Sequence, residues 1–536
     1  AVQYCLGIVQ IINNSLSTRR EYCLLSHPDS LRIMVSSSKA TDESTVKQVH
    51  RHSAKKVTDH DFEPEKHFYP RVLNASLHPM VACFLNLGNE RIAKRYTHLH
   101  PGVEKEAIMN IFNYQPAYFS WSGADLFHVT NEHAQRQMIV IETNSCPSGQ
   151  KSMPAWDSAD DRGETGYHRL LLNSFADLIN RRASTLPEGG LAAVYDKNPM
   201  EASGYAAVLA EIFKETVFYV EFHSNDPDPP VKWIDGVMYV RDEADAWHPI
   251  RAAFRYVTQK PWNRFPVVTK TLVYNPVLAC LAGGRNKLVA AKAYDFFNAE
   301  MVNSGLQICS PDTVTDVTLA EIPLYVRSMG WHAVIKVPYS NAGQGVYTIT
   351  SKTELDRFMA LHHHYDKFIV QQLVGNLKWS STGKHGTYYH VGTIPNNRSN
   401  TFVADLRMMV ASTSKGYVPM VVYGRRAQEP LADELTEVTD SWAILGTNLS
   451  IKMEDGQWGT DTNRLVLMDR KDFNKLGISV DDLIEAYVQT IMSSMAIDKM
   501  CKKLMTKEGR FNIELFSSLN SDHQLFDEIM KGDTTQ

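Results

Sequence analysis

The sequence predicts a mixed α/β protein that is built from several packed units. Between residues 190 and 240, short apolar runs alternate with one amphipathic segment, which is typical of strands that flank a helix. Apolar runs at 138–149 and 402–427 indicate further buried strands. At about 150 residues per unit, a chain of 536 residues accommodates roughly three or four units.

The composition indicates a globular, cytoplasmic protein and argues against two classes of partner. Hydrophobic residues make up 43% of the chain and charged residues 21%, as in ordinary soluble domains. The 55 basic and 60 acidic residues give a formal charge of −5, whereas a nucleic-acid partner requires a basic surface. The apolar start at 1–12 is too short to span a membrane. Seven cysteines, an odd number without a C-x-x-C pair, indicate reduced thiols.

The region 161–285 is expected to form an α/β unit. LAAVYD at 191–196 and VFYVEF at 217–222 predict strands, and the segment 202–215 between them predicts a helix. VKWIDGVMYV predicts a hairpin that turns at Asp235 and Gly236, because Asp-Gly is a frequent two-residue turn. Strands that alternate with a helix favour a parallel sheet.

The second half of the chain contains further strand and helix patterns. In chain order, they predict a helix at 286–302, two strands around a glycine loop within 331–349, a helix at 353–364, strands at 367–374, 402–412 and 417–427, and a helix at 480–504. Gly305 and Pro311 follow the first of these helices as stop signals.

Lys336 and the loop behind it form the first candidate site. Lys336 lies at the end of a predicted strand, and the loop from Pro338 to Gly345 also contains Gly343. A lysine neutralises phosphate charge, and glycines permit backbone angles that turn consecutive N–H groups toward an anion. The pattern indicates a phosphate-binding loop; an ordinary hairpin with a surface lysine is the alternative.

Glu142 and Asn144 form the second candidate site. Alternate residues of a strand point to the same face, so both side-chain oxygens can face one ion. Asp125, in the run GADLF, is expected on the preceding strand. Oxygen ligands of this type suit Mg²⁺, which also keeps water and substrate phosphates as ligands. A strand end that is capped by polar residues is the alternative.

The third candidate site combines acidic and basic residues. Asp405 and Arg407 lie on one predicted strand, Arg425 and Arg426 end the next, and Asn448 follows in the run GTNLS. Arginines offer fixed, planar donors to carboxylate or phosphoryl oxygens. An ion pair between neighbouring strands is the alternative.

In this order, the motifs resemble those of circularly permuted ATP-grasp enzymes of the carboxylate–amine ligase type. Lys336, the loop AGQG, FIVQQLV, DLR, the RR pair and TNLS follow one another as in that superfamily, and the helix from Lys287 resembles its lysine-bearing helix. GADLF and IETNSCPSG resemble the metal-binding strands that usually close such a chain, but here they stand early. Eukaryotic glutathione synthetase, which the chain distantly resembles, also carries its E-x-N strand early.

Two positions depart from the pattern of that family. In glutathione synthetase an acidic residue follows the lid lysine, where this chain has Val337. The adenine-contact strand often carries Glu, where this chain has Gln372. The resemblance therefore does not imply glutathione synthesis.

The resemblance implies a role for each segment of the chain. Residues 1–160 would carry the permuted metal-binding strands, and 161–285 would form an α/β substrate domain. Residues 286–375 would supply the lysine helix and the ATP lid, and 376–536 the rest of the core with a C-terminal helix.

It also implies site residues. The implied ligands of two Mg²⁺ ions are Asp125, Glu142 and Asn144. The implied catalytic residues are Lys336, Arg407 and Arg426. The implied ATP contacts are Lys287, Lys336, Ser340, Asn341, Gly343, Gln344, Gly345, Gln371, Gln372, Leu373 and Val374. The candidate substrate contacts are Arg255 and Asn448.

The implied activity is ATP-dependent formation of an amide or peptide bond through an acyl phosphate, with release of ADP and phosphate. The expected partners are a small carboxylic acid and an amine, such as an amino acid or a peptide, together with a second copy of the chain in a homodimer. Two other classes stay open. One is an ATP-grasp phosphotransferase that acts on a small molecule, and the other is a non-catalytic ATP-binding protein.

Overall fold

The computed structural model describes residues 51–155, 165–340, 343–436, 439–452 and 458–533. Three large sheets, a two-stranded ribbon and many helices make up these ranges, so the predicted α/β class is confirmed. The described residues, all of which lie from residue 51 onward, form one compact unit. The predictions for the apolar start at 1–12 and for Asn341 lie outside the described residues.

The seven-stranded sheet has a parallel centre. Its order is β1-β5-β4-β8-β7-β6, and β9 also pairs with β8. The parallel strands are β5 (Val217–Glu221), β4 (Gly190–Tyr195), β8 (Trp247–Tyr256) and β9 (Leu272–Tyr274). The antiparallel strands are β1 (Lys55–Val57), β6 (Val231–Ile234) and β7 (Val237–Arg241). The predicted parallel sheet is confirmed, as is the hairpin, where Asp235 and Gly236 both have positive φ.

One buried helix covers the centre of this sheet. α8 (Pro199–Phe213) connects β4 to β5 and packs against both strands. Most of its length is apolar and buried, but Glu201 is also fully buried. The sequence pattern at 202–215 therefore located this helix correctly, although the helix begins earlier.

The four-stranded sheet is antiparallel throughout, in the order β10-β13-β11-β12. Its strands are β10 (Thr313–Val317), β11 (Ala333–Lys336), β12 (Val346–Ile349) and β13 (Phe368–Gln372). α11 (Ile322–Ser328) and α12 (Lys352–Met359) pack on it around an apolar cluster of their own, which includes Val326, Ile335 and Phe358.

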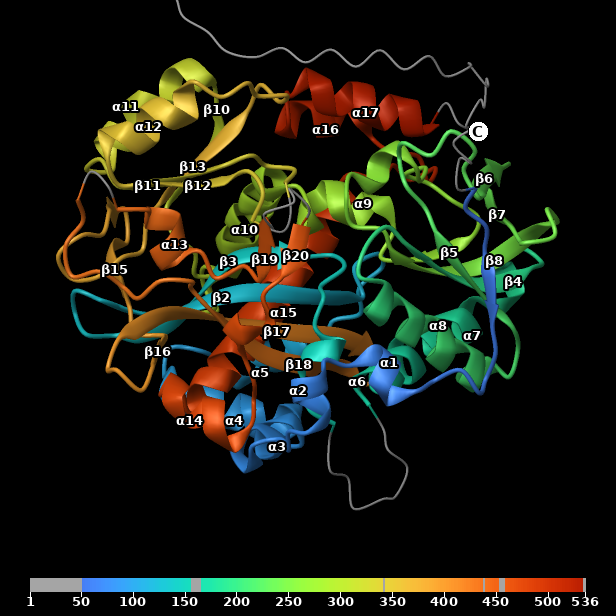
Figure 1. The fold of residues 1–536 in the computed structure, drawn as a ribbon, viewed down its shortest axis with the longest axis horizontal. Coiled ribbons are helices and arrows are strands. Elements are labelled where there is room, and N and C mark those ends of the chain that lie inside the picture. Colours follow the sequence, from blue (N-terminus) through green and yellow to red (C-terminus); the bar gives the residue numbers. More distant parts are fainter. Residues whose placement is uncertain (1–50, 156–164, 341–342, 437–438, 453–457, 534–536) are drawn as a thin grey trace, which may run out of the picture. The chain divides into compact units, whose positions relative to one another are not determined.

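The eight-stranded sheet joins distant parts of the chain. Its order is β14-β15-β2-β17-β18-β21, with β3 paired to β2 and β16 to β17. The long strands are β2 (Trp121–Asn131), β3 (Arg136–Asn144), β17 (Thr401–Thr413) and β18 (Gly416–Arg426). Figure 1 shows β2, from the first third of the chain, beside β17 from the last third. The register of this sheet therefore decides which of the candidate site residues meet.

Two long helices pack beside the eight-stranded sheet. α15 (Val480–Lys503) crosses β2, β3 and β17, and its central residues are buried. α10 (Lys287–Met301) packs against α15. Both helices were predicted from their apolar spacing, and both are confirmed.

The remaining elements are shorter. The strands are β14 (Thr382–Gly383), β15 (Gly386–His390), β16 (Thr393–Pro395), β19 (Ser450–Lys452), β20 (Trp458–Thr460) and β21 (Leu465–Val466). The helices are α1 (Pro64–His67), α2 (Pro70–Leu73), α3 (Pro79–Leu85), α4 (Asn89–Leu99), α5 (Lys105–Phe112), α6 (Gly166–Leu170), α7 (Asp177–Arg182), α9 (Val277–Ala279), α13 (Ser441–Leu445), α14 (Arg470–Leu476), α16 (Ile513–Leu519) and α17 (His523–Asp533). None of the described helices has the length and apolar character needed to cross a membrane.

The three large sheets can be located within the predicted segments. Segment 161–285 holds every strand of the seven-stranded sheet except β1, and segment 286–375 holds the whole four-stranded sheet. The eight-stranded sheet draws on both 1–160 and 376–536.

Candidate active site

Three polar side chains meet on the β2–β3 hairpin. The antiparallel register places Asp125 opposite Glu142 and Gly123 opposite Asn144. Asn144 Nδ2 donates to Glu142 Oε1 at 3.3 Å, so these two side chains lie on one face, as expected for alternate residues of a strand. The prediction that the three residues lie on adjacent strands is confirmed.

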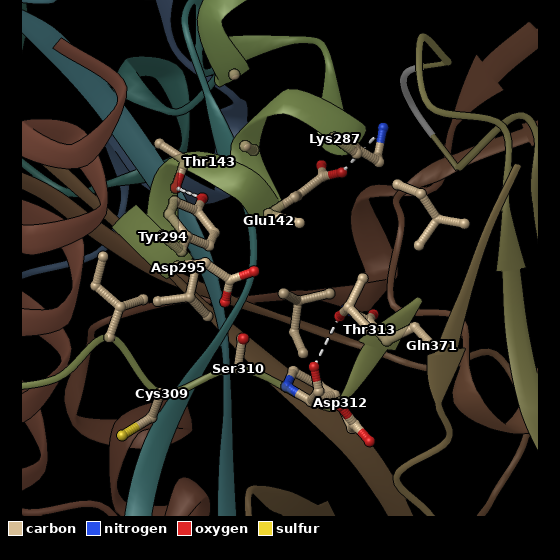
Figure 2. A pocket seen from close by; sticks show the side chains of 18 of the residues that line it. Glu142, Thr143, Lys287, Tyr294, Asp295, Cys309, Ser310, Asp312, Thr313 and Gln371 are labelled. Atoms are coloured by element: carbon tan, nitrogen blue, oxygen red, sulfur yellow. Dashed lines mark hydrogen bonds and ion pairs between the residues drawn. The ribbon is translucent and has the colours of Figure 1, made fainter. Parts of the chain in front are cut away.

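Two lysines from the second half of the chain flank Glu142. Lys287, the first residue of α10, lies 3.4 Å from Glu142 Oε2 and donates to the Ser340 carbonyl at 2.6 Å. Figure 2 shows the side chains of Lys287 and Glu142 pointing toward each other. Lys336, the last residue of β11, is buried and donates to the Ile141 carbonyl at 3.4 Å. Glu142, from the first third of the chain, therefore lies beside two lysines from the second half.

The packing of these charges changes their titration. Burial lowers the pKa of Lys336 to about 8, although Glu142 opposes this shift. Burial alone would raise the pKa of Glu142, but Lys287 and Lys336 outweigh it and hold that pKa below its ordinary value. Glu142 is therefore ionised at neutral pH, and an anion bound beside Lys336 would favour the charged ammonium.

Two arginines and two aspartates form a buried ladder across β2, β17 and β18. Arg407 lies opposite Asp125 and donates to both of its oxygens, at 2.5 and 2.7 Å. Arg425 contacts Asp125 at 2.9 Å and also pairs with Asp405. Because guanidinium groups hold both Asp125 oxygens, the side chains on β3 are the freer candidates for a metal ion.

The β3 side chains suit Mg²⁺. This ion takes one or two protein carboxylates together with water and substrate phosphates, and Glu142 offers one such carboxylate. Asn144 Oδ1 accepts a hydrogen bond from Arg285 Nη1 at 3.2 Å, but a carbonyl oxygen has a second lone pair for a metal contact. The oxygen atoms of Glu142 and Asn144 therefore suit one Mg²⁺ ion.

Arg425, rather than Arg426, is the arginine that the structure places at this site. Successive residues of a strand point to opposite faces. Arg426 lies over the Phe402 ring, 4.6 Å from its centre, and lines a separate surface cavity with Arg398. Arg426, predicted as a catalytic residue, therefore lies away from Glu142, and Arg425 is the arginine that contacts Asp125.

Arg255 lies in the core and lines none of the three described cavities around Glu142. Its side chain is 1% exposed and donates to the carbonyls of Asn275 and Val257, each at 2.7 Å. Its predicted substrate role has no support in this position. Asn448, the other predicted substrate contact, does line two cavities beside Glu142.

The glycine loop lies against Asn448. Gly343 and Gly345 have φ values of +76° and +73°, a region that favours glycine. A Cβ atom on Gly343 would come within 3.1 Å of Asn448 Nδ2 and of the Trp442 ring. Ser340 and Gln344, which are also predicted to contact ATP, belong to the described part of this loop. Asn341 lies outside the described residues.

A cavity of 110 Å³ lies between the four-stranded and eight-stranded sheets. Ile141, Val334 and Leu373 give it apolar walls, and Lys336 and Arg425 add charge. Residues 371–374, whose backbone is predicted to contact adenine, also line it. The cavity therefore combines an apolar slot with cations that could neutralise phosphates.

Gln372 contributes little hydrogen-bonding capacity to this cavity, and His390 contributes no charge to it at neutral pH. Gln372 donates to the carbonyls of Ser381 and Gly386 and accepts from the Asp312 N–H, so its amide is used within the fold. His390 is buried, and burial lowers its pKa to about 4, which leaves the ring neutral at pH 7. Among the described residues neither ring nitrogen of His390 has a hydrogen-bond partner, so this ring is a polar group that the wall offers to a ligand.

Three cavities converge on Glu142. The second, of 260 Å³, is bordered by α10 and shares Glu142 and Lys336 with the first. Figure 2 shows this cavity, in which Tyr294 donates to Thr143 Oγ1 at 2.8 Å. The third, of 130 Å³, adjoins Glu142 and Arg407. Glu142 thus lies at the junction where ligands in different cavities would meet.

Several lining residues of the third cavity were not predicted. They are Lys151, Lys197 and Arg285. Arg285 stands just before the lysine-bearing helix, and Lys151 follows the Pro-Ser-Gly turn. Their closeness to these two motifs in the sequence could have marked both residues as candidates for the site. Lys197 had no such signal.

Comparison with known proteins gives only distant matches. No protein-family model matches the chain, and no curated protein matches it. Matching solved structures include a RimK domain ATP-grasp protein from Sphaerobacter thermophilus, with 13% identity and a TM-score of 0.25 over 44% of this chain and 90% of that one. Another is a glutathione synthetase-like effector from Globodera pallida, with 7% identity and a TM-score of 0.31 over 65% and 82%. Both scores lie below 0.5, so neither structure assigns an activity to this chain.

Proposed function

We propose that the chain binds Mg-ATP between its four-stranded and eight-stranded sheets and uses it to activate a carboxylate for amide-bond formation. The observation that supports this best is the position of Glu142. Its carboxylate lies 3.4 Å from Lys287 Nζ and lines all three cavities. A phosphate chain beside it would be flanked by cations, and an acid in the next cavity would reach the same point.

The nucleotide occupies the cavity between the sheets. Its base fits the apolar slot, with the backbone at 371–374 along its edge. Lys287 and Lys336 neutralise phosphate oxygens as point charges, and the loop that contains Gly343 and Gly345 covers them. Burial of the phosphates in this space strengthens each of these electrostatic contacts.

Glu142 and Asn144 are the residues that would hold Mg²⁺. The ion would supply charge neutralisation of the β- and γ-phosphates. Arg407 and Arg425 act independently of it as fixed donors toward the transferring phosphoryl group. Because Asp125 and Asp405 already hold their guanidinium groups, little reorganisation is needed when negative charge develops.

The reaction proceeds in two displacements. A carboxylate oxygen of the acid bonds to the γ-phosphorus, and the bond from that phosphorus to the bridging oxygen breaks, with its electron pair leaving on ADP. An amine nitrogen then bonds to the acyl carbon, and the carbon–oxygen bond to phosphate breaks. Phosphate leaves with that electron pair while the nitrogen loses a proton. The protein contributes positioning and charge stabilisation to both steps.

The test is a screen for ADP release with a panel of carboxylic acids, each with and without amines. Hydroxylamine in the assay traps an acyl phosphate as a hydroxamate. Acid-dependent ADP release with a hydroxamate, and with an amide when the amine is present, is the expected result. A stable phosphorylated product without amide would identify a phosphotransferase instead. ATP binding without any ADP formation would identify a binding protein.

A further inference from the structure

The third cavity carries a surplus of positive charge and is here called the cationic cavity. Its basic lining residues are Lys151, Lys197, Arg285, Arg407 and Arg425. Among the described lining residues, the only carboxylate is that of Glu142. Two of the five cations are neutralised by the aspartates of the ladder, so the surplus lies on Lys151, Lys197 and Arg285.

Arg285 has unused hydrogen-bonding capacity in this cavity. Its side chain is 8% exposed, and Nη1 donates to Asn144 Oδ1 at 3.2 Å. Its Nε is buried and has no hydrogen-bond partner within the described part of the chain. A buried charged donor without an acceptor is costly, so this atom points to an acceptor that a ligand supplies.

The two lysines are only weakly compensated. In the ranges that the structure describes, no side chain forms an ion pair or hydrogen bond with Lys197 Nζ. Burial, followed by the charge of Arg285, lowers its pKa to about 8, although the charge of Asp196 opposes this shift. Lys151 is 5% exposed and lies 3.8 Å from Glu201 Oε2. Glu201 already accepts hydrogen bonds from the turn at 148–150, so it compensates Lys151 in part.

The position of this cavity in the fold is also that of a ligand site. Lys197 follows β4, and Thr258 follows β8, which is its parallel neighbour. Ligands of α/β sheets bind at the carboxyl ends of parallel strands, and both residues line the cavity at that end. The charge surplus and the strand topology therefore point to the same place independently.

We propose, building on the proposed function, that the cationic cavity binds a second anionic group of the acid substrate. The acid is then at least a dianion, such as a dicarboxylic acid or a peptide with two carboxylates. Its reacting carboxylate lies near Glu142 and Arg407, and its second group lies among Lys151, Lys197 and Arg285. Monocarboxylic acids leave these cations unpaired and are poor substrates.

Matched pairs of acids test this proposal in the wild-type protein. Succinate, glutarate and adipate are compared with butyrate, pentanoate and hexanoate in the ADP-release assay. A charge-assisted contact typically changes affinity by about tenfold to a hundredfold, so kcat/KM should favour the dianion of each pair by that factor. ADP release that is equal within the pairs would overturn the proposal and leave the proposed function standing.

A variant locates the effect. Lys197→Gln should raise KM for glutarate about tenfold or more while leaving KM for pentanoate nearly unchanged, and Lys197→Arg should retain the preference. Lys471→Gln, an exposed position on α14, is the matched control. Equal losses for both acids in Lys197→Gln would contradict the assignment.

A binding measurement separates the two proposals if no acid releases ADP. Ligand-observed NMR with glutarate and pentanoate, in the presence of ADP, reports binding without turnover. Selective binding of glutarate that is lost in Lys197→Gln would support the cavity assignment even though the proposed ligase activity had failed. No preference for glutarate in the wild-type protein would overturn the assignment.

Discussion

Arg407 and Asp125 face each other across neighbouring strands, 282 positions apart in the chain, and are joined by hydrogen bonds of 2.5 and 2.7 Å. Burial alone would raise the pKa of Asp125, but Arg407 and Arg425 outweigh it and hold that pKa well below its ordinary value. The pair therefore stays ionised and fixes the guanidinium group at the candidate site.

The two arginines at the end of β18 should behave differently. Arg425→Ala leaves Asp125 and Asp405 with less compensation in a buried position, and loss of one partner from such a cluster typically costs about 3–5 kcal/mol of unfolding free energy. Arg426→Ala removes a contact with Phe402 on the opposite face and should cost roughly 1 kcal/mol or less. Urea unfolding of the two variants measures the difference. Similar losses would contradict the assigned faces.

Activity provides a second comparison at the same positions. Arg425→Lys keeps the charge but loses the bidentate geometry, and ADP release should fall on the order of a hundredfold. Arg426→Lys should retain nearly normal ADP release. A larger loss in Arg426→Lys than in Arg425→Lys would restore the original prediction for Arg426.

Glu142→Gln should remove most turnover without unfolding the protein. Loss of an outer partner of a metal ligand already costs about 10–100-fold in activity, so loss of the ligand charge itself should cost about a hundredfold or more. ADP release gives the rate, and circular dichroism monitors the fold. Glu434→Gln, in an ion pair at the surface, is the matched control. Near-normal ADP release from Glu142→Gln would exclude the metal assignment.

Lys336→Met should weaken ATP binding. The substitution keeps most of the length of the side chain but removes the charge from a buried position beside the proposed phosphates. One charge-assisted contact typically corresponds to about a tenfold to hundredfold change in Kd. Titration with a fluorescent ATP analogue measures it, with Lys378→Met, at an exposed ion pair, as the control. An unchanged Kd would remove Lys336 from the site.

His390 should make the protein less stable in acid. Its pKa in the folded protein is about 4, below the value of about 6.5 for an unfolded chain. The unfolded state binds more protons between these values, so this contribution to the free energy of unfolding is lost as pH falls from about 6.5 to about 4. From pH 7.5 to pH 5, wild type should lose about 2 kcal/mol more than His390→Gln in urea unfolding.

The control for this prediction is His133→Gln. His133 has an exposed side chain, so its removal should leave the pH dependence of wild type unchanged. If wild type and His390→Gln lose the same unfolding free energy on acidification, His390 does not titrate as a buried neutral ring.

The strands of the candidate site were predictable because their residue patterns carry the information. Glu142 and Asn144 are alternate residues of one strand, and such residues share a face whatever the neighbouring elements are. The choice between Arg425 and Arg426 was not predictable in the same way. A shift of one residue moves a side chain to the other face of a sheet. Because both successive residues are arginines, the sequence pattern does not indicate which of them faces the site.

Other residues depended on contacts that only the folded chain forms. An arginine on a strand can point into the core or into a cavity, and the carbonyls of Asn275 and Val257 hold Arg255 in the core. Lys197 lines the cationic cavity because β4 and β8 are parallel neighbours. That pairing joins segments that are separated in the sequence, so the sequence pattern around Lys197 does not indicate it. The helices between residues 64 and 112 were also absent from the predictions.

The four-stranded sheet has an apolar cluster of its own, which includes Val326 and Phe358 and is separate from the large core. A rigid tilt of this sheet would keep that cluster intact but would change the contacts of Ile369 on β13, which belongs to the large core. The same tilt would strain polar contacts at the edge of the sheet, such as those from Lys287 to Ser340 and from Lys336 to Ile141. A nucleotide could then enter and leave while both cores stay folded, and the rate of its exchange would depend on these rim contacts.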